Sequence, residues 1–475
     1  MCGIVGFIGQ EKVIYDIYSG LLTLQHRGQD SAGIVTFKDN FRIKKGLGLV
    51  NEVFDNKHFE RLDGNIGLGH VRYTTHGNSN LENAQPVTTN YPFGIAMVHN
   101  GNVTNFKEMN RAMYHDYHVM PTSSNDVEMI LYTLAAELKN KDLGKIDSDD
   151  IFNAVKVTQK KVEGAYAVIA MIANHGLLAF QDPYGIRPLI LGKKETEKGV
   201  TYGLASESVT FDHLGYTIIR DLKPGEIVFI DKDNQLHTTI GHVKERAFCV
   251  FEYIYFARED ANFLQKNVAG GRVKMGRIIA QQIRESGLKP DVVIDVPTSG
   301  YFAASGLAEE LKIPYHRGLF KSNYIGRSFI APDQEMREHI VKQKLNPIKK
   351  TVRDKKVVVV DDSIVRGTTS KRIVKILKEA GAKEVYFVSS APPVTHPCVY
   401  GIDMSVKTEL IAANKSIDEI KEYIEADALF YLKPESLDEI FDTFSTCKAC
   451  FTGKYPAGNV TQMLGDIEQE KSEMR

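Results

Sequence analysis

The sequence predicts two domains of different fold class: a layered, mostly antiparallel α+β domain, then an α/β domain with a parallel sheet. At 475 residues the chain is too long for one ordinary core, which indicates two domains of roughly 200–250 residues each. The first half carries short alternating apolar runs separated by glycine and asparagine, and the second half alternates apolar strands with amphipathic helices. We expect the two domains to span residues 2–235 and 236–475.

Short apolar runs bounded by turn residues predict the strands of the first domain. These runs cover residues 2–9, 30–37, 65–73, 93–103, 165–173, 176–182, 187–193 and 217–231. Two stretches, 13–28 and 125–140, place apolar residues at helical spacing instead. Together they indicate a layered domain with helices covering antiparallel sheets.

The elements expected in the second domain follow a different pattern. Residues 289–297, 355–362 and 384–391 are near-continuous apolar runs, as expected of strands that are buried on both faces. Residues 276–287 and 370–381 read as amphipathic helices that end at glycine. Because these helices alternate with the strands, a parallel sheet is predicted.

Charge and hydropathy limit the possible partners and compartments. The 59 basic and 60 acidic side chains give a formal net charge of −1, which weighs against a nucleic-acid binder. No apolar stretch reaches the 18 or so residues that a membrane helix needs, and the N-terminus lacks the pattern of a secretory signal. We therefore expect a cytoplasmic protein whose five cysteines stay reduced.

The stretch VVVVDDSIVRGTTS, residues 357–370, predicts a ligand site in the second domain. A buried strand ends in two adjacent carboxylates, and a glycine and four hydroxyl side chains precede a helix. Ligands of open α/β sheets bind beyond the carboxyl ends of strands, where small residues and a helix N-terminus receive phosphate. Paired acids would repel phosphate, so they suit ribose hydroxyls or a Mg²⁺ ion.

This motif resembles the phosphoribosyl-pyrophosphate (PRPP) loop of type I phosphoribosyltransferases. The resemblance implies that Asp361 and Asp362 contact ribose hydroxyls and Mg²⁺, with Ser299 of an earlier turn, DVPTSGYFAA, near the same ion. Thr298 departs from the family, which often has a carboxylate there. The residues implied to hold the 5′-phosphate and its surroundings are Ser363, Val365, Arg366, Gly367, Thr368 and Thr369.

The segment KSNYIGRSFI, residues 321–330, looks like the loop that closes over PRPP in the same family. Its cations Lys321 and Arg327 suit the neutralisation of phosphates, and Gly326 suits mobility. Without the neighbouring PRPP-loop motif, a plain basic surface loop would be an equally good interpretation.

Cys2 stands directly after the initiator methionine, and removal of Met1 would give it a free α-amino group. That amine has an ordinary pKa of about 7.7–8.0, so part of it is an unprotonated base at neutral pH. A terminal thiol thus carries its own general base and needs an oxyanion hole when it attacks an amide. Asn100 and Gly101 are candidates for that hole, Arg72 for an α-carboxylate clamp and Asp126 for an ammonium ligand.

Each of these features also has an ordinary structural explanation, such as a turn, a surface ion pair or a helix N-cap. Their combination resembles the glutaminase domain of N-terminal-nucleophile amidotransferases. The segments that carry the resemblance are MCGIVGFIG, LQHRGQDSAGI, GHVRYTTHG, MVHNGN and SSNDVE. It implies an αββα sandwich in which Cys2 hydrolyses glutamine through a thioester, Arg72 and Asp126 bind glutamine, and Asn100 and Gly101 form the oxyanion hole.

Four cysteines remain: Cys249, Cys398, Cys447 and Cys450. The last two form a C-x-x-C, the spacing at which two thiolates reach one metal centre. The residues alone leave open a zinc site, an iron–sulfur cluster, a redox pair or unrelated buried thiols.

A glutaminase domain joined to a PRPP-binding domain resembles the amidophosphoribosyltransferase family. One branch carries a structural [4Fe–4S] cluster, and its cysteine contexts match AFCVFEYIYF, HPCVYGID and CKACFTGKYP. The resemblance implies formation of 5-phosphoribosylamine from glutamine and PRPP, the first committed step of purine synthesis. It also implies bound Mg²⁺, control by purine nucleotides and a homotetramer. Two alternatives are a PRPP-sensing regulator, which would not need Cys2, and an amidotransferase with another acceptor, which the 357–370 motif disfavours.

Overall fold

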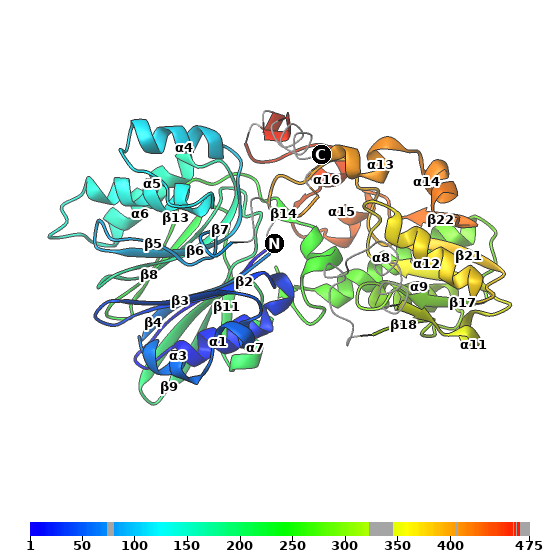
Figure 1. The fold of residues 1–475 in the computed structure, drawn as a ribbon, viewed down its shortest axis with the longest axis horizontal. Coiled ribbons are helices and arrows are strands. Elements are labelled where there is room, and N and C mark those ends of the chain that lie inside the picture. The colour runs from blue at the N-terminus through cyan, green and yellow to red at the C-terminus, as the bar shows by residue number, and fades with distance from the viewer. Residues whose placement is uncertain (74–79, 323–344, 405, 459, 462, 466–475) are drawn as a thin grey trace.

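The computed structural model describes residues 1–475 except 74–79, 323–344, 405, 459, 462 and 466–475. Two domains lie side by side, and the N-terminus lies at the junction between them (Figure 1). The predicted pairing of an α+β domain with an α/β domain is confirmed.

Two antiparallel sheets form the centre of the first domain. The seven-stranded sheet has the order β11 (Thr217–Asp221), β9 (Ile190–Thr196), β10 (Gly199–Ala205), β1 (Gly3–Ile8), β4 (Ile66–Arg72), β2 (Ser31–Phe37) and β3 (Phe41–Leu47). The six-stranded sheet has the order β13 (Leu236–Ile240), β12 (Glu226–Asp231), β8 (Gly176–Gln181), β7 (Gly164–Ile172), β6 (Ile95–Val103) and β5 (Val87–Thr89). Aliphatic side chains from both sheets pack between them as one core layer.

Helices cover the outer face of each sheet, which completes the expected αββα sandwich (Figure 1). The seven-stranded sheet is covered by α1 (Ile14–Thr23), α2 (Val50–Val53), α3 (Asn56–Arg61) and α7 (Val209–Leu214). The six-stranded sheet is covered by α4 (Phe106–His115), α5 (Val127–Lys139) and α6 (Ser148–Lys161). Because both faces of each sheet are covered, β1, β2, β4 and β7 are buried along their whole length.

The first domain extends beyond the boundary predicted at residue 235. Strand β13, Leu236–Ile240, pairs with β12 over five residues and closes the edge of the six-stranded sheet. Most of its residues are partly or fully exposed, and they form no run of apolar residues in the sequence. This strand was therefore not predicted from the sequence. The division between the domains therefore belongs after Ile240.

The second domain contains the predicted parallel sheet, in the order β17 (Val292–Asp295), β20 (Lys356–Asp361), β21 (Glu384–Ser389) and β22 (Ala428–Tyr431). Its main helices are α8 (Val268–Glu285), α9 (Tyr301–Leu311), α12 (Thr368–Glu379) and α14 (Ile417–Tyr423). Shorter elements are β18 (Leu319–Lys321), β19 (Leu345–Pro347), α11 (Lys349–Val352), α13 (Ile411–Asn414) and α15 (Ser436–Ile440). The predicted strands and helices of this domain are confirmed.

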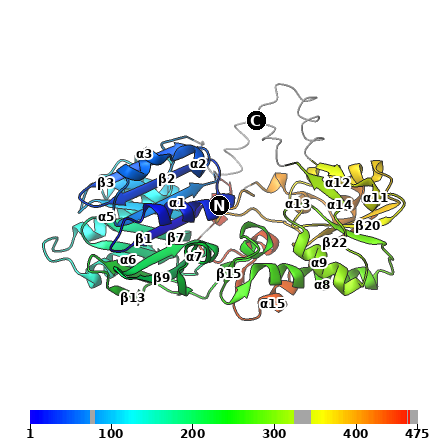
Figure 2. The ribbon, with the colours of Figure 1, turned by 90° about the horizontal axis from the view of Figure 1, so that it is seen from below.

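The junction between the domains is built from segments that are far apart in sequence. Strand β14 (Phe248–Cys249) pairs in parallel with β23 (Thr446–Cys447), and α16 (Ala449–Thr452) follows β23. A π-helical turn at Glu252–Phe256 and the hairpin β15 (Asn262–Phe263) and β16 (Lys266–Asn267) complete it. Both views place the N-terminus beside these segments (Figure 2).

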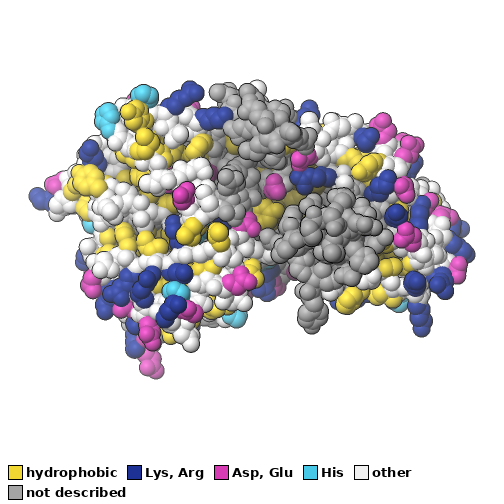
Figure 3. Space-filling model, viewed as in Figure 1, with side chains coloured by type: hydrophobic (Ala, Val, Ile, Leu, Met, Phe, Trp, Pro, Cys, Tyr) yellow, Lys and Arg dark blue, Asp and Glu magenta, His cyan; other side chains and the backbone are white. Residues whose placement is uncertain are grey.

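On the visible face of the molecule, basic and acidic side chains of the described residues are interspersed over both domains (Figure 3). This distribution accords with the near-zero net charge of −1. Within the described part of the chain, none of the helices combines the length and the hydrophobicity that crossing a bilayer demands.

Candidate functional site

Cys2 lies at the junction, immediately before β1, and its side chain is partly exposed. Its backbone nitrogen donates to the Asn100 side-chain oxygen at 3.1 Å. With Met1 in place this nitrogen is a peptide N–H, and it stands where the α-amine of a processed chain would be. Met1 itself is buried, and burial lowers the pKa of its amino group to about 6, with Arg187 and Arg27 contributing in the same direction.

Strand β6 presents the predicted oxyanion-hole residues beside Cys2. Asn100 is buried, and its Nδ2 has no hydrogen-bond partner among the described residues. An unsatisfied buried amide donor is costly, so this group is suited to an oxygen that arrives with the substrate. Gly101 has φ of +151° and an added Cβ would lie 1.9 Å from the Ala165 carbonyl oxygen, which restricts the position to glycine.

The two residues predicted to bind the glutamine amino-acid group lie near this strand. Arg72 is the last residue of β4 and is buried. Asp126 stands at the start of α5 but makes no side-chain cap. Its carboxylate instead accepts from the backbone N–H of Val103 at 2.8 Å and contacts His99 Nε2 at 3.3 Å. Asp126 thus occupies the N-cap position of α5 without capping the helix through its side chain, and its carboxylate is held against β6.

The second domain packs directly on the strand that carries Asn100 and Gly101. The Asn102 side chain donates to the Val399 carbonyl at 2.8 Å, and both residues are buried. Gly401 has φ of +99°, and a Cβ there would lie 2.9 Å from the Gly101 carbonyl oxygen. The candidate oxyanion hole is thus supported by the segment that follows Cys398.

We predict that Gly401→Ala lowers glutamine-dependent kcat by about tenfold or more, because the new methyl group displaces Gly101 from its position as an oxyanion donor. Gly287→Ala is the matched control, since Gly287 also has a positive φ, +75°, but a Cβ added there would have no heavy atom within 4 Å. Steady-state glutaminase assays of both variants test this. Equal losses in the two variants would show that backbone strain, not contact with Gly101, is responsible.

The turn after β20 brings together most of the predicted PRPP-loop residues. Gly367 adopts φ of +77° immediately before α12, and Thr368 and Thr369 are exposed at the first turn of that helix. The Val365 carbonyl accepts from Ile411 N–H at 2.9 Å. Arg366 pairs with Glu409 at the surface. The helix N-terminus therefore faces solvent with small and hydroxyl side chains around it.

A pocket of about 370 Å³ opens in front of this helix, lined by Val296, Pro297, Lys321, Leu345, Thr368, Thr369, Arg372 and Ile373. Lys321 Nζ donates to the Thr298 hydroxyl at 3.2 Å. Thr298 has φ of +80°, a strained conformation for a β-branched residue. Arg327, the other predicted cation, lies outside the described residues.

Asp361 and Asp362 are both buried at the end of β20. The Ser299 hydroxyl donates to Asp361 at 2.8 Å, which joins the earlier turn to this pair. Burial and the adjacent Asp362 raise the pKa of Asp361 well above its ordinary value. Burial also raises the pKa of Asp362. Two buried carboxylates at one strand end form an all-oxygen group that suits a hard cation or hydroxyl ligands.

The four remaining cysteines are buried and lie in one region of the junction. Cys249 and Cys447 are direct partners in the β14–β23 pairing, and the Cys450 carbonyl accepts from the backbone N–H groups of Thr395 and His396, just before Cys398. Burial raises the pKa of the Cys450 thiol, and Cys398, Cys447 and Cys249 raise it further. Among the described residues, no three candidate ligands are close enough to hold a single metal ion.

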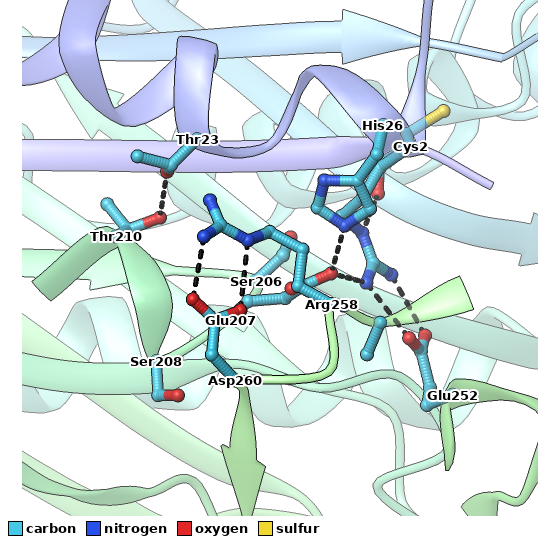
Figure 4. A network of polar contacts seen from close by, with 12 residues as sticks. Cys2, Thr23, His26, Ser206, Glu207, Ser208, Thr210, Glu252, Arg258 and Asp260 are labelled. Atoms are coloured by element: carbon cyan, nitrogen blue, oxygen red, sulfur yellow. Dashed lines mark hydrogen bonds and ion pairs between the residues drawn. The ribbon is translucent and has the colours of Figure 1, made fainter. Parts of the chain in front are cut away.

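A buried ion-pair network beside Cys2 was not predicted from the sequence (Figure 4). Arg27 donates to the Cys2 carbonyl, to Glu207 and to Glu252, and all three charged side chains have no exposed surface. Two of these residues lie in segments quoted above, Arg27 in LQHRGQDSAGI and Glu252 in AFCVFEYIYF, but the two are 225 positions apart. Only the fold shows that they meet.

Tyr255 is a second residue that sequence reasoning missed. About half of its surface, 52%, is exposed. Burial raises the pKa of its hydroxyl, as do Asp362, Tyr73 and Asp361. The tyrosine is therefore close enough to Tyr73 of the first domain and to the carboxylate pair of the second to be affected by their charges.

Comparisons with known proteins agree with this geometry. The phosphoribosyl transferase domain family matches residues 270–408, and the glutamine amidotransferase domain family matches residues 70–213. The amidophosphoribosyltransferase of Escherichia coli (strain K12) is 44% identical over 448 residues, covering 93% of this chain and 88% of that protein. The amidophosphoribosyltransferase of Archaeoglobus fulgidus is 42% identical over 464 residues, covering 96% and 98%.

A solved structure of a glutamine PRPP amidotransferase from B. subtilis, complexed with ADP and GMP, superposes with a TM-score of 0.87. It shares 39% identity and covers 97% of this chain and 98% of that one. The likeness thus extends over both domains and their junction. The chain belongs to the amidophosphoribosyltransferase family.

Proposed function

We propose that the chain transfers the amide nitrogen of glutamine to PRPP, giving 5-phosphoribosylamine, glutamate and pyrophosphate, the first committed step of purine synthesis. One observation carries this proposal. A single chain contains the Cys2–Asn100 pair in its first domain and the Asp361–Asp362 turn in its second, and a buried junction joins the two domains. Full-length relatives of the same family support it.

In the glutaminase half, removal of Met1 frees the Cys2 amine to accept the thiol proton. The thiolate attacks the glutamine side-chain amide, and Asn100 Nδ2 and the Gly101 N–H stabilise the oxyanion. Ammonia leaves, and water hydrolyses the thioester. Arg72 holds the α-carboxylate and Asp126 the ammonium of glutamine.

In the second half, ammonia reaches C1 of PRPP and displaces pyrophosphate. Ammonia that escaped to water would be protonated and lose its nucleophilicity, so the path needs shielding from solvent. One cluster of buried apolar side chains extends from Val5 and Leu24 in the first domain to Val250, Phe251 and Val399 at the junction. Side chains of this cluster would shield such a path from water.

The PRPP loop holds the substrate through several groups of different chemistry. Ser363, Val365, Arg366, Gly367, Thr368 and Thr369 surround the 5′-phosphate, and Lys321 and Arg327 neutralise the pyrophosphate. Asp361, Asp362 and Ser299 supply oxygen ligands that fit Mg²⁺. When bound, Mg²⁺ neutralises the negative charge of the leaving pyrophosphate.

Cys249, Cys398, Cys447 and Cys450 would hold a [4Fe–4S] cluster, and the chain would then belong to the iron–sulfur branch of the family. In such a cluster each thiolate binds a different iron, so four sulfurs need not converge on a single point. Four buried thiols that the fold gathers at one junction suit this arrangement. The cluster would crosslink β14, β23 and the Cys398 segment as a structural group.

We predict that the chain purified without oxygen is brown and contains about four iron atoms per chain, as expected for one [4Fe–4S] cluster. Metal analysis and the visible absorption spectrum measure this. Chelation of the iron should lower thermal stability, because the cluster crosslinks segments of the junction. Stoichiometric zinc without iron would instead support the zinc site that the cysteine spacing left open.

We also propose control by purine nucleotides, a cytoplasmic location and a homotetrameric assembly. The solved relative from B. subtilis was complexed with ADP and GMP, which supports nucleotide control. Nucleotides carry phosphates that compete with PRPP at the α12 N-terminus. The oligomeric state follows from the family resemblance, and mass photometry tests it.

The proposed function is tested by a steady-state assay with glutamine and PRPP, each present or omitted, in which glutamate and pyrophosphate are measured together. Equal rates of formation of the two products, dependent on both substrates, are expected. Glutamate formation without any PRPP-dependent pyrophosphate would refute the proposed acceptor.

A further inference from the structure

We infer that Glu252, a residue of the second domain, is a positioning residue for the Cys2 nucleophile and acts through Arg27. The inference rests on the proposed function, because it assigns a role within the glutaminase half of that reaction. It means that the glutaminase centre is incomplete without the phosphoribosyltransferase domain.

The position of Cys2 is set by two polar contacts of its backbone. Strand β1 begins at Gly3, so the ladder pairing of β1 starts only after Cys2. The Cys2 nitrogen donates to Asn100 Oδ1 at 3.1 Å, and the Cys2 carbonyl accepts from Arg27 Nε at 2.9 Å. The Arg27 contact therefore fixes the carbonyl side of the residue and, with it, the direction of the thiol.

Arg27 is held in turn by Glu252. The carboxylate of Glu252 accepts from Arg27 Nη1 and Nη2, each at 2.9 Å, in a bidentate pair. Bidentate arginine–carboxylate pairs fix orientation as well as distance. Glu207 of the first domain takes a further bond from Nη1 at 2.6 Å. Every nitrogen of the guanidinium thus has an assigned partner, and Nε is turned toward Cys2.

Burial makes this arrangement hard to replace. Arg27, Glu207 and Glu252 have no exposed side-chain surface, so water cannot substitute for a lost partner. Burial opposes the charge of Arg27, but Glu252 and Glu207 raise its pKa above the ordinary value. Without the Glu252 charge, Arg27 would keep one carboxylate, Glu207, and move toward it. That movement would weaken the bond to Cys2.

The segment that carries Glu252 is anchored to the first domain at further points, of which Figure 4 shows Arg258 beside Glu207. Glu207 accepts from the Arg258 backbone N–H at 3.2 Å, and the Ser208 hydroxyl accepts from Asn262 N–H at 2.8 Å. Asp221 accepts from Leu264 N–H at 3.1 Å. These bonds hold the π-helical turn against the first domain, so Glu252 is presented to Arg27 in a fixed position.

The test compares Glu252→Gln with the control Glu245→Gln. Glu245 is an exposed carboxylate seven residues earlier that accepts from the Ser445 hydroxyl, and the amide oxygen of glutamine can accept the same bond. For Glu252→Gln, kcat with glutamine should fall by about 10- to 100-fold, as expected when a nucleophile is misplaced. The KM for glutamine should change less, since Arg72 and Asp126 are untouched. Synthesis from PRPP and ammonia should stay within about twofold of wild type, because that step does not use Cys2.

Alkylation of Cys2 by iodoacetamide, followed by mass spectrometry, gives a readout besides turnover. The rate of Cys2 alkylation in Glu252→Gln should differ from the wild-type rate, whereas the rate in Glu245→Gln should equal it. A double-mutant cycle with Arg27→Gln identifies the route of action: the double variant should lose no more glutaminase activity than Arg27→Gln alone. If Glu252→Gln does not fold, Glu252→Asp, which keeps the charge on a shorter side chain, takes its place and should show a smaller loss.

Parallel losses with glutamine and with ammonia would overturn the inference, as would full glutaminase activity or multiplicative losses in the double variant. These results are distinguishable from failure of the proposed function. A wild-type chain that makes no pyrophosphate from PRPP would refute that function, whereas an active wild type with an unaffected Glu252→Gln would refute only the role of Glu252.

Discussion

Cys2→Ala is expected to abolish glutamine-dependent synthesis while leaving synthesis from ammonia intact. Loss of the nucleophile removes the thioester route entirely, so kcat with glutamine should fall by roughly 10⁴-fold or more. The PRPP turn at Asp361 and Asp362 belongs to the other domain and does not use the thiol. At high ammonium concentration and alkaline pH, PRPP-dependent pyrophosphate release should stay within about twofold of wild type.

Alanine is the appropriate replacement for two reasons. It is small, so removal of Met1 should proceed as with cysteine, and the intact mass of the protein checks this. It also keeps the backbone nitrogen that bonds to Asn100 and the carbonyl that bonds to Arg27. Equal loss of both activities in a folded Cys2→Ala protein would contradict the division of labour between the domains.

Local patterns were sufficient to predict the class of each domain and many of its elements, although β3, β10, α4 and α6 were not predicted. Strands such as Val292–Asp295 and Lys356–Asp361 are continuous apolar runs because helices cover both faces of the parallel sheet. Helices α8 and α12 end just before Gly287 and Gly381, both of which have positive φ. Strand β13 was missed because it lies at a sheet edge, where half-exposed residues carry no clear period.

The candidate site residues also fall into two groups, those whose proximity the sequence predicts and those that only the fold brings together. Asp361, Asp362, Gly367 and Thr368 fall within one turn, so their proximity follows from their spacing in the sequence. The contacts that join the domains do not have this property. Arg27 and Glu252 are 225 residues apart, and Asn102 and Val399 are 297 apart. No periodicity encodes such pairs, because they depend on how two independently patterned domains pack together.

Asp361→Asn combined with Asp362→Asn should eliminate measurable PRPP binding while leaving glutaminase folding unchanged. The double variant removes both negative charges that would hold a cation and weakens the acceptors for ribose hydroxyls. It also removes the repulsion between two buried carboxylates whose pKa values are raised by burial. We therefore expect a Tm equal to or above that of wild type, so loss of binding would not reflect loss of structure.

Isothermal titration with PRPP and Mg²⁺ measures the binding, and Asp418→Asn serves as the control. Asp418 lies in the same domain, but its side chain is 86% exposed and its ion pair with Lys421 lies at the surface. The control should bind PRPP as wild type does. Unchanged PRPP affinity in the Asp361/Asp362 variant would refute the assignment, because no other described group at the end of β20 offers two adjacent carboxylates to a cation. Lost affinity together with a lowered Tm would place the pair in the structural core of the domain instead.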